Sequence, residues 1–110
     1  MKTSELGSFL GARCIQEQYL DRVFSGVYTS DLLSDAMANA VDNGILVTIQ
    51  AHKNTVAVGT LKDLAAIVIC NNRPVPDDMI EAARAEGIAL FLTTESQYTV
   101  SGKLYGALNA

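Results

Sequence analysis

The only histidine of the chain lies in a short polar segment, Gln50 to Thr55, that follows a run of apolar residues. His52 and Lys53 offer an imidazole and an ammonium group, and Asn54 and Thr55 are residue types that often begin helices. Main-chain N–H groups at the start of a helix attract anions, so this segment is typical of an anion-binding loop. The alternative is that Asn54 only caps the helix and that His52 is an ordinary exposed loop residue.

Three further polar segments, at 29–31, 71–73 and 93–96, also follow strand-like runs. The carboxyl ends of parallel strands meet at one edge of a sheet, and open α/β folds bind ligands there. Asn71 and Asn72 suit a plain left-handed turn, and recognition of a ligand by amide and guanidinium groups is the alternative. The ligand-site candidates from the four segments are Ser30, Asp31, Gln50, His52, Lys53, Asn54, Thr55, Asn71, Arg73 and Thr94.

No complete set of catalytic residues is visible. The sequence contains neither a G-x-x-x-x-G-K-[ST] phosphate loop nor a G-x-G-x-x-G motif, and no cysteine or histidine pair has metal-ligand spacing. With one histidine and no activated serine or cysteine, triad-type hydrolysis has no support. We therefore expect a protein that is not an enzyme and that uses no cofactor and no metal ion.

The elements that must position the candidate residues follow from the apolar patterning. The runs 45–49, 66–70 and 88–92 are almost entirely apolar, and the first two are rich in β-branched residues, which is typical of strands covered on both faces in a parallel sheet. The segments 54–64 and 77–86 between them are long enough for crossover helices, so the sequence predicts strand, helix, strand, helix, strand in parallel order. Other expected elements are a helix from Thr3 ended by Gly11, strands at 13–15 and 26–29, an amphipathic helix from Leu32 to Val41 capped by Ser30 or Asp31, and a last helix from about Glu95.

The length predicts one small domain that spans residues 1–110. The apolar runs and the helical segments between them predict a mostly parallel sheet with helices packed on both faces. The net charge is −4 and the basic residues are not clustered, so we do not expect nucleic acid as a partner. No apolar run approaches the roughly 20 residues that span a bilayer, and no signal-peptide core is present, so we expect a cytoplasmic protein without a membrane partner. Cys14 and Cys70 lie in strand-like runs, which predicts buried, reduced thiols.

Two stretches carry a resemblance to a known family. The stretch from Leu20 to Ala40, which contains Asp21-Arg22 and Gly26-Val27-Tyr28-Thr29, resembles the opening of DRTGG domains, and Val47 to Gly59 resembles their second strand and the helix after it. The stretches 76–88 and 102–105 fit the remainder with less specific motifs. The Asp-Arg of the family's naming motif is present, whereas Val23-Phe24-Ser25 replaces the Thr-Gly-Gly before Gly26.

The resemblance implies a fold similar to the N-terminal domain of HPr kinase and to the uridine-nucleotide-binding N-terminal domains of some Mur ligases. Within larger proteins, such domains accompany CBS pairs or phosphotransacetylase catalytic domains as regulatory modules. Stand-alone members are sometimes named serine kinases, but the HPr kinase activity belongs to a separate phosphate-loop domain, and this sequence has no such loop.

Two functions from different classes remain open at this point. The first is a regulatory module that senses a small anionic ligand, a nucleotide or a phosphorylated metabolite, and works as a homo-oligomer, most simply a homodimer. The alternative is a protein-interaction module for a metabolic or redox enzyme, with no small-molecule ligand. Loss of ligand binding on substitution of His52 separates them, because only the first function places a ligand near that side chain.

Overall fold

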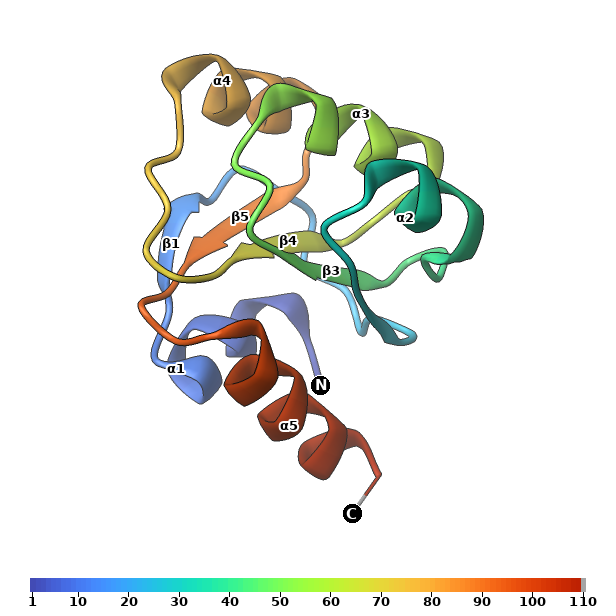
Figure 1. Cartoon of the computed structure of the whole chain (residues 1–110), viewed down its shortest axis with the longest axis vertical. Helices are drawn as coiled ribbons and strands as arrows, with labels where there is room; N and C mark the ends of the chain where they lie inside the picture. Colours follow the sequence, from blue (N-terminus) through green and yellow to red (C-terminus); the bar gives the residue numbers. More distant parts are fainter. Residues whose placement is uncertain (110) are drawn as a thin grey trace.

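The computed structural model describes residues 1–109 and contains one five-stranded sheet in the order β1-β5-β4-β3-β2 (Figure 1). The strands are β1 (Arg13–Gln16), β2 (Val27–Thr29), β3 (Ile45–Thr48), β4 (Ala66–Ile69) and β5 (Ala89–Leu92). Strands β2 to β5 are parallel and pair in sequence order, whereas β1 pairs antiparallel with β5 and forms the opposite edge from β2. The mostly parallel α/β fold that the sequence predicts is therefore confirmed.

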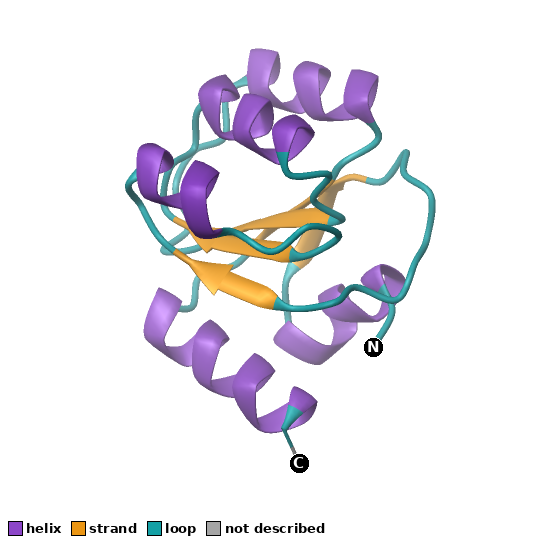
Figure 2. Cartoon of the chain, turned by 90° about the vertical axis from the view of Figure 1, so that its right-hand side faces the viewer, coloured by secondary structure: helices purple, strands orange, loops and turns teal. Residues whose placement is uncertain are grey.

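The helices form a layer on each face of the sheet, as Figure 2 shows. After a 3₁₀ turn at Thr3–Glu5, they are α1 (Leu6–Leu10), α2 (Leu33–Asn39), α3 (Lys53–Leu61), α4 (Asp77–Glu86) and α5 (Gln97–Leu108). The three connections that contain α2, α3 and α4 each lead to the next strand in the same direction across the sheet. Because such parallel connections are almost always right-handed, these three helices lie on the same face. Helices α1 and α5 cover the other face (Figure 2).

Alternating side chains of the central strands divide the core into two clusters. Leu46, Ile67 and Leu90 face α2, α3 and α4, where they pack with buried residues such as Met79 and Ala83. Val47, Val68 and Phe91 face the other way and pack with residues of α1 and α5, among them Leu6, Leu10, Val100 and Leu104. Strands buried on both faces explain why their sequences read as unbroken apolar runs rather than as alternating ones.

The bounds of α4 agree with the sequence prediction because local signals mark both ends. Pro76 is the N-cap residue, and Gly87 ends the helix with a left-handed φ of 67°. Gly11, with a φ of 66°, ends α1 in the same way. In both places a glycine without a Cβ adopts the conformation that closes the helix.

The helix predicted from Leu32 to Val41 is shorter than expected at both ends, and neither Ser30 nor Asp31 caps it. Helix α2 has only seven residues, Leu33–Asn39, and its N-cap position is Leu32, which is 65% exposed. Of the expected apolar stripe only Ala36 and Ala40 are buried. Asp31 lies outside the helix because its carboxylate bonds to the end of β3 instead of capping α2.

The two cysteines differ in their surroundings. Cys70 is 0% exposed, as the sequence predicts, and it directly follows β4 rather than lying within the strand. Cys14 is only partly buried, because β1 is an edge strand, and its thiol donates to the carbonyl of Gln16 at 3.3 Å. Both thiols are free. Within the described residues, no helix combines the length and the apolar character needed to cross a membrane.

Candidate functional site

The carboxyl ends of β2, β3, β4 and β5 meet at one side of the sheet, and we call the loops that follow them, at 30–32, 49–52, 70–76 and 93–96, the carboxyl edge. The helices α2 to α5 all begin at this edge. Their first main-chain N–H groups therefore point toward it, which favours negative charge there. All ten residues that the sequence predicts for a ligand site lie in or directly beside these loops.

Asp31 is the centre of the first group of predicted residues. One of its carboxylate oxygens, Oδ1, accepts hydrogen bonds from Ile49 N at 3.1 Å and from Thr48 Oγ1 at 3.2 Å. Thr48 Oγ1 in turn accepts from Gln50 N at 3.1 Å, and Ser30 N donates to the carbonyl of Val47. Ser30, Asp31 and Gln50 are therefore brought together, and their polar groups hold the ends of β2 and β3 in place.

His52 is the N-cap residue of α3. Its Nδ1 accepts a hydrogen bond of 3.0 Å from Asn54 N, so in this arrangement that nitrogen carries no proton. The expectation that Asn54 caps the helix is therefore wrong, whereas the expectation that His52 is exposed is confirmed. Thr55 Oγ1 donates to the carbonyl of Gln50 at 2.8 Å, and Lys53 and Asn54 line a groove of about 330 Å³ between α3 and α4.

The loop after β4 is fastened to the loop after β5. Asn71 and Asn72 both have left-handed φ angles, of 60° and 50°, and their N–H groups donate to the carbonyls of Glu95 and Thr93 at 2.9 Å and 2.8 Å. The tight-turn interpretation of the paired asparagines is therefore confirmed for the main chain. Arg73 follows this turn with an exposed side chain.

The ten predicted residues do not form one cluster. Ser30, Asp31 and Gln50 lie at the end of β3, and the residues from His52 to Thr55 begin α3. Arg73 and Thr94 line hollows beside β1, and Asn71 belongs to the turn before Arg73. The strand order explains this separation. Strands β2, β3, β4 and β5 lie side by side in the order of the sequence. Ligand crevices in open α/β sheets form where the strand order reverses, and these four strands contain no such point.

Arg13 lies beside the carboxyl edge, although no motif or spacing in the sequence predicts it there. It is the first residue of β1, but the antiparallel register places it opposite Leu92, the last residue of β5. It lines two adjoining hollows of about 390 and 410 Å³, together with Asn72, Arg73, Thr93 and Thr94 among others. Only the direction of β1 in the sheet brings Arg13 to this edge, and no local sequence signal reports that direction.

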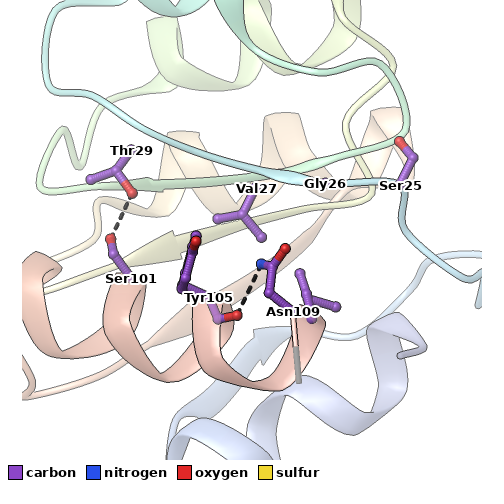
Figure 3. A pocket seen from close by; sticks show the side chains of 8 residues that line it. Ser25, Gly26, Val27, Thr29, Ser101, Tyr105 and Asn109 are labelled. Atoms are coloured by element: carbon purple, nitrogen blue, oxygen red, sulfur yellow. Dashed lines mark hydrogen bonds between the residues drawn. The ribbon is translucent and has the colours of Figure 1, made fainter.

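A hollow of about 410 Å³ lies at the other side of the sheet, between β2 and α5 (Figure 3). The hydroxyl groups of Thr29 and Ser101 share a hydrogen bond of 2.7 Å at one end, and Tyr105, 72% exposed, lies along its wall. The carbonyl of Gly26 and the N–H of Ser30 form hydrogen bonds with β3. Because successive residues of a strand point their main-chain groups to opposite sides, those of Val27 and Thr29 point away from β3, toward the unpaired edge of β2. None of the ten predicted residues lines this hollow.

The Asp-Arg pair of the DRTGG motif has structural contacts away from the carboxyl edge. The two carboxylate oxygens of Asp21 accept from Ser4 N at 2.9 Å and from Ser4 Oγ at 2.7 Å. These bonds, the side-chain one first, hold the pKa of Asp21 below its usual value. Arg22 forms an ion pair with Asp63 at 3.1 Å and also donates to the carbonyl of Asp63, a residue with a left-handed φ of 49°.

Three further groups near the carboxyl edge, Tyr28, Asp35 and Cys70, have shifted pKa values. Tyr28 OH donates to Asp35 Oδ2 at 2.7 Å, and this bond is the main cause that lowers the pKa of Asp35 and raises that of Tyr28. Burial raises the pKa of the Cys70 thiol to about 11, with a smaller contribution from the charge of Asp31. Within residues 1–109, no group of three or more histidine, cysteine, aspartate or glutamate side chains is arranged to hold a metal ion.

Comparison with known proteins supports the fold. No family model matches the sequence, and no curated protein matches it either. Among solved structures, the chain is similar to the CBS and DRTGG domains of the regulatory region of Clostridium perfringens pyrophosphatase, which was crystallised with its activator, diadenosine tetraphosphate. The TM-score is 0.79 at 14% sequence identity, over 93% of this chain and 45% of that one. The chain therefore has a DRTGG-like fold and spans less than half of this structural neighbour.

Proposed function

We propose that this protein is a non-catalytic regulatory module of the DRTGG family that binds a small anionic ligand, a nucleotide or a phosphorylated metabolite, at its carboxyl edge. The observation that carries the proposal is the distribution of positive charge. Arg22, Lys62 and Arg84 are engaged in ion pairs, whereas Arg13, Lys53 and Arg73 all lie at the carboxyl edge with no carboxylate of residues 1–109 in ion-pair range. These three cations are available to an anionic ligand at that end of the sheet.

The helix N-termini at the same edge support an anionic ligand, since their N–H groups favour negative charge near them. The fold supports a regulatory role, because the structural neighbour is the regulatory region of a pyrophosphatase crystallised with a nucleotide activator. We include in the proposal that the module works as a homodimer. A light-scattering mass equal to that of one chain would contradict the homodimer without affecting the proposed ligand site.

A thermal-shift screen of the whole protein tests the proposal. Nucleotides, phosphorylated metabolites and acyl-coenzyme A compounds form the panel, and a ligand at 100 times its dissociation constant adds about 2.7 kcal/mol, which raises the melting temperature by several degrees. We expect at least one saturable shift that falls as salt increases, because exposed charges are screened. A flat panel with well-folded protein would overturn the proposal.

The contribution of His52 and Lys53 needs variants that keep α3 capped. His52→Ala removes the cap acceptor for Asn54 N and costs about 1 kcal/mol of stability in itself, so loss of binding in that variant is ambiguous. His52→Asn keeps a cap acceptor and removes the imidazole, and Lys53→Gln removes the ammonium group. Weaker ligand binding in both variants, with an unchanged melting temperature of the free protein, supports a site at the start of α3.

The free edge of β2 favours a second candidate, the interaction module without a small ligand. Its outward main-chain groups are flanked by exposed apolar side chains of α5, Tyr105 and Leu108. Tyr105→Lys is expected to abolish binding of a partner enzyme there, whereas Tyr98→Lys, on the same helix at an 89% exposed position outside the hollow, is the matched control. Equal effects of the two variants would contradict a partner surface at this edge.

A further inference from the structure

The two hollows beside Arg13 form one continuous surface at the end of the sheet where β1 pairs with β5. Arg13, Asn72 and Leu92 line both of them. The two hollows have volumes of about 390 and 410 Å³, which are within the range of small-molecule sites. We call this surface the Arg13–Arg73 hollow.

Both arginines of this hollow are carried by fixed main chain. The register of β1 on β5 places Arg13 opposite Leu92, and this pairing anchors the start of the strand. The turn before Arg73 is held by the bonds from Asn71 N to Glu95 O and from Asn72 N to Thr93 O. Two guanidinium groups from opposite sides of the β5 end therefore border the same hollow.

The polar lining of the hollow consists of cations and neutral groups. Asn72, Thr93 and Thr94 accompany the two arginines, and no aspartate or glutamate lines either part, although the chain has 12 acidic residues. Arg13 and Arg73 have no carboxylate within ion-pair distance among residues 1–109. Thr93 Oγ1 accepts from Glu95 N, which leaves the hydroxyl proton of this buried residue available as a donor.

The opposite wall of the hollow is apolar. Ile15 of β1, Pro74 and Val75 of the loop before α4, and Ile80 of α4 line it together with Leu92. Val75, Ile80, Ile15 and Leu92 are only partly buried and pack at the border of the core that lies under α2, α3 and α4. A ligand that suits both walls has a compact anionic head and an apolar or planar body.

We propose that the Arg13–Arg73 hollow binds a phosphate monoester, with the phosphate between the two guanidinium groups and the organic part against Ile15, Val75 and Ile80. The planar guanidinium fork matches phosphate oxygens in pairs, and two such forks suit a dianion better than a single carboxylate. This inference rests on the proposed anionic ligand and assigns its head group to β1 and the loop after β4, rather than to the start of α3.

A ¹⁵N-resolved NMR titration of the full chain with phenyl phosphate, at constant ionic strength, tests the assignment. Inorganic phosphate and phenol, the two halves of this probe, are titrated separately for comparison. We expect saturable shifts of the amides of Arg13, Asn72 and Thr94, tighter binding of phenyl phosphate than of either half, and no comparable shifts with sodium chloride. Arg13→Gln and Arg73→Gln are each expected to weaken binding about tenfold or more, because a charge-assisted contact to phosphate is lost. Both side chains are exposed, so neither variant disturbs the core.

Lys103→Gln is the matched control, since it removes the same charge from α5 and lines neither hollow; it is expected to change the affinity by less than about twofold. Unchanged binding in both arginine variants, or shifts that follow ionic strength alone, would overturn the assignment. If a ligand from the thermal-shift panel binds and its affinity depends on Lys53 but not on Arg13 or Arg73, the proposed function stands and this inference fails. If neither that panel nor phenyl phosphate binds, both fail.

Discussion

Gln97 Nε2 donates a hydrogen bond of 3.0 Å to Asp31 Oδ2 and so joins the first residue of α5 to the loop between β2 and α2. The other oxygen of the same carboxylate accepts from Ile49 N and Thr48 Oγ1 at the end of β3. One side chain thus connects three segments that are far apart in the sequence. Substitutions of Asp31 are therefore expected to lower the stability of the fold whether or not a ligand binds nearby.

Asp31→Ala is expected to lower the free energy of unfolding by about 2–4 kcal/mol, because it leaves Ile49 N and the Gln97 amide without their charged acceptor. Asp31→Asn is expected to cost about half as much. Its amide oxygen still accepts from Ile49 N, and Gln97 can turn its Oε1, a buried atom with no partner in residues 1–109, toward the new amide. Urea denaturation measures both variants, with Glu17→Ala at an exposed position as the control. Equal losses in the two Asp31 variants would contradict this geometry.

Tyr28→Phe is expected to raise the pKa of Asp35 toward its ordinary value, because the Tyr28 hydroxyl is the first cause of the lowered pKa. A carboxylate whose pKa is lowered by folding stabilises the fold above its unfolded pKa and loses that contribution as the pH falls through the folded value. The stability difference between the wild type and Tyr28→Phe should therefore shrink below about pH 3.8, the reference value for aspartate. Carboxyl-carbon NMR titration gives the pKa directly, and Asp21, whose partner is Ser4, should be unaffected.

The parts of the fold that the sequence predicts correctly are those with local signals. The β-branched runs of β3 and β4 are buried on both faces, and α4 has a proline before it and a glycine after it, so neither depends on knowledge of distant residues. The residue types favour Asn54 or Thr55 as the cap of α3, whereas the helix begins one residue earlier than Asn54 and His52 is the N-cap. The predicted cap of α2 is wrong because Asp31 bonds to the end of the neighbouring strand β3 rather than to its own helix.

The candidate site depends more strongly on long-range structure. The sequence places ten residues at the carboxyl edge, but their separation into groups follows from the strand order, which apolar periodicity does not report. Arg13 was missed for a related reason. A basic residue at the start of a strand reaches this edge only if that strand runs antiparallel to the others, and the pairing of β1 with β5 joins segments more than 70 residues apart.

Asp21→Ala is expected to loosen the N-terminal segment without unfolding the domain. The carboxylate of Asp21 accepts from both the main-chain N–H and the hydroxyl of Ser4, while Thr3 N bonds separately to the carbonyl of Arg22. Because these bonds are at the surface, their loss should raise the amide hydrogen-exchange rate of Ser4 and its neighbours far more than that of the buried strand β4. Asp21→Asn, which keeps one acceptor, should have a smaller effect. Exchange rates that rise uniformly over the whole domain would contradict a local tether.

Cys14 is expected to react with a thiol reagent in the native protein, and Cys70 only after unfolding. Both thiols have a raised pKa through burial, but Cys14 is partly exposed whereas Cys70 is 0% exposed and has a pKa of about 11.

The raised pKa of Cys70 also predicts an effect on stability at high pH. A thiol whose folded pKa exceeds its reference value of 9.0 stabilises the fold fully below that pH, and the contribution is lost as the pH rises toward 11. Cys70→Ala should therefore lose less stability than the wild type between pH 9 and 11, although its melting temperature at pH 7 is lower because of the cavity. If the free energy of unfolding changes equally with pH in the two proteins, Cys70 does not titrate in this range. Rapid labelling of Cys70 in the native state would contradict its burial in the core.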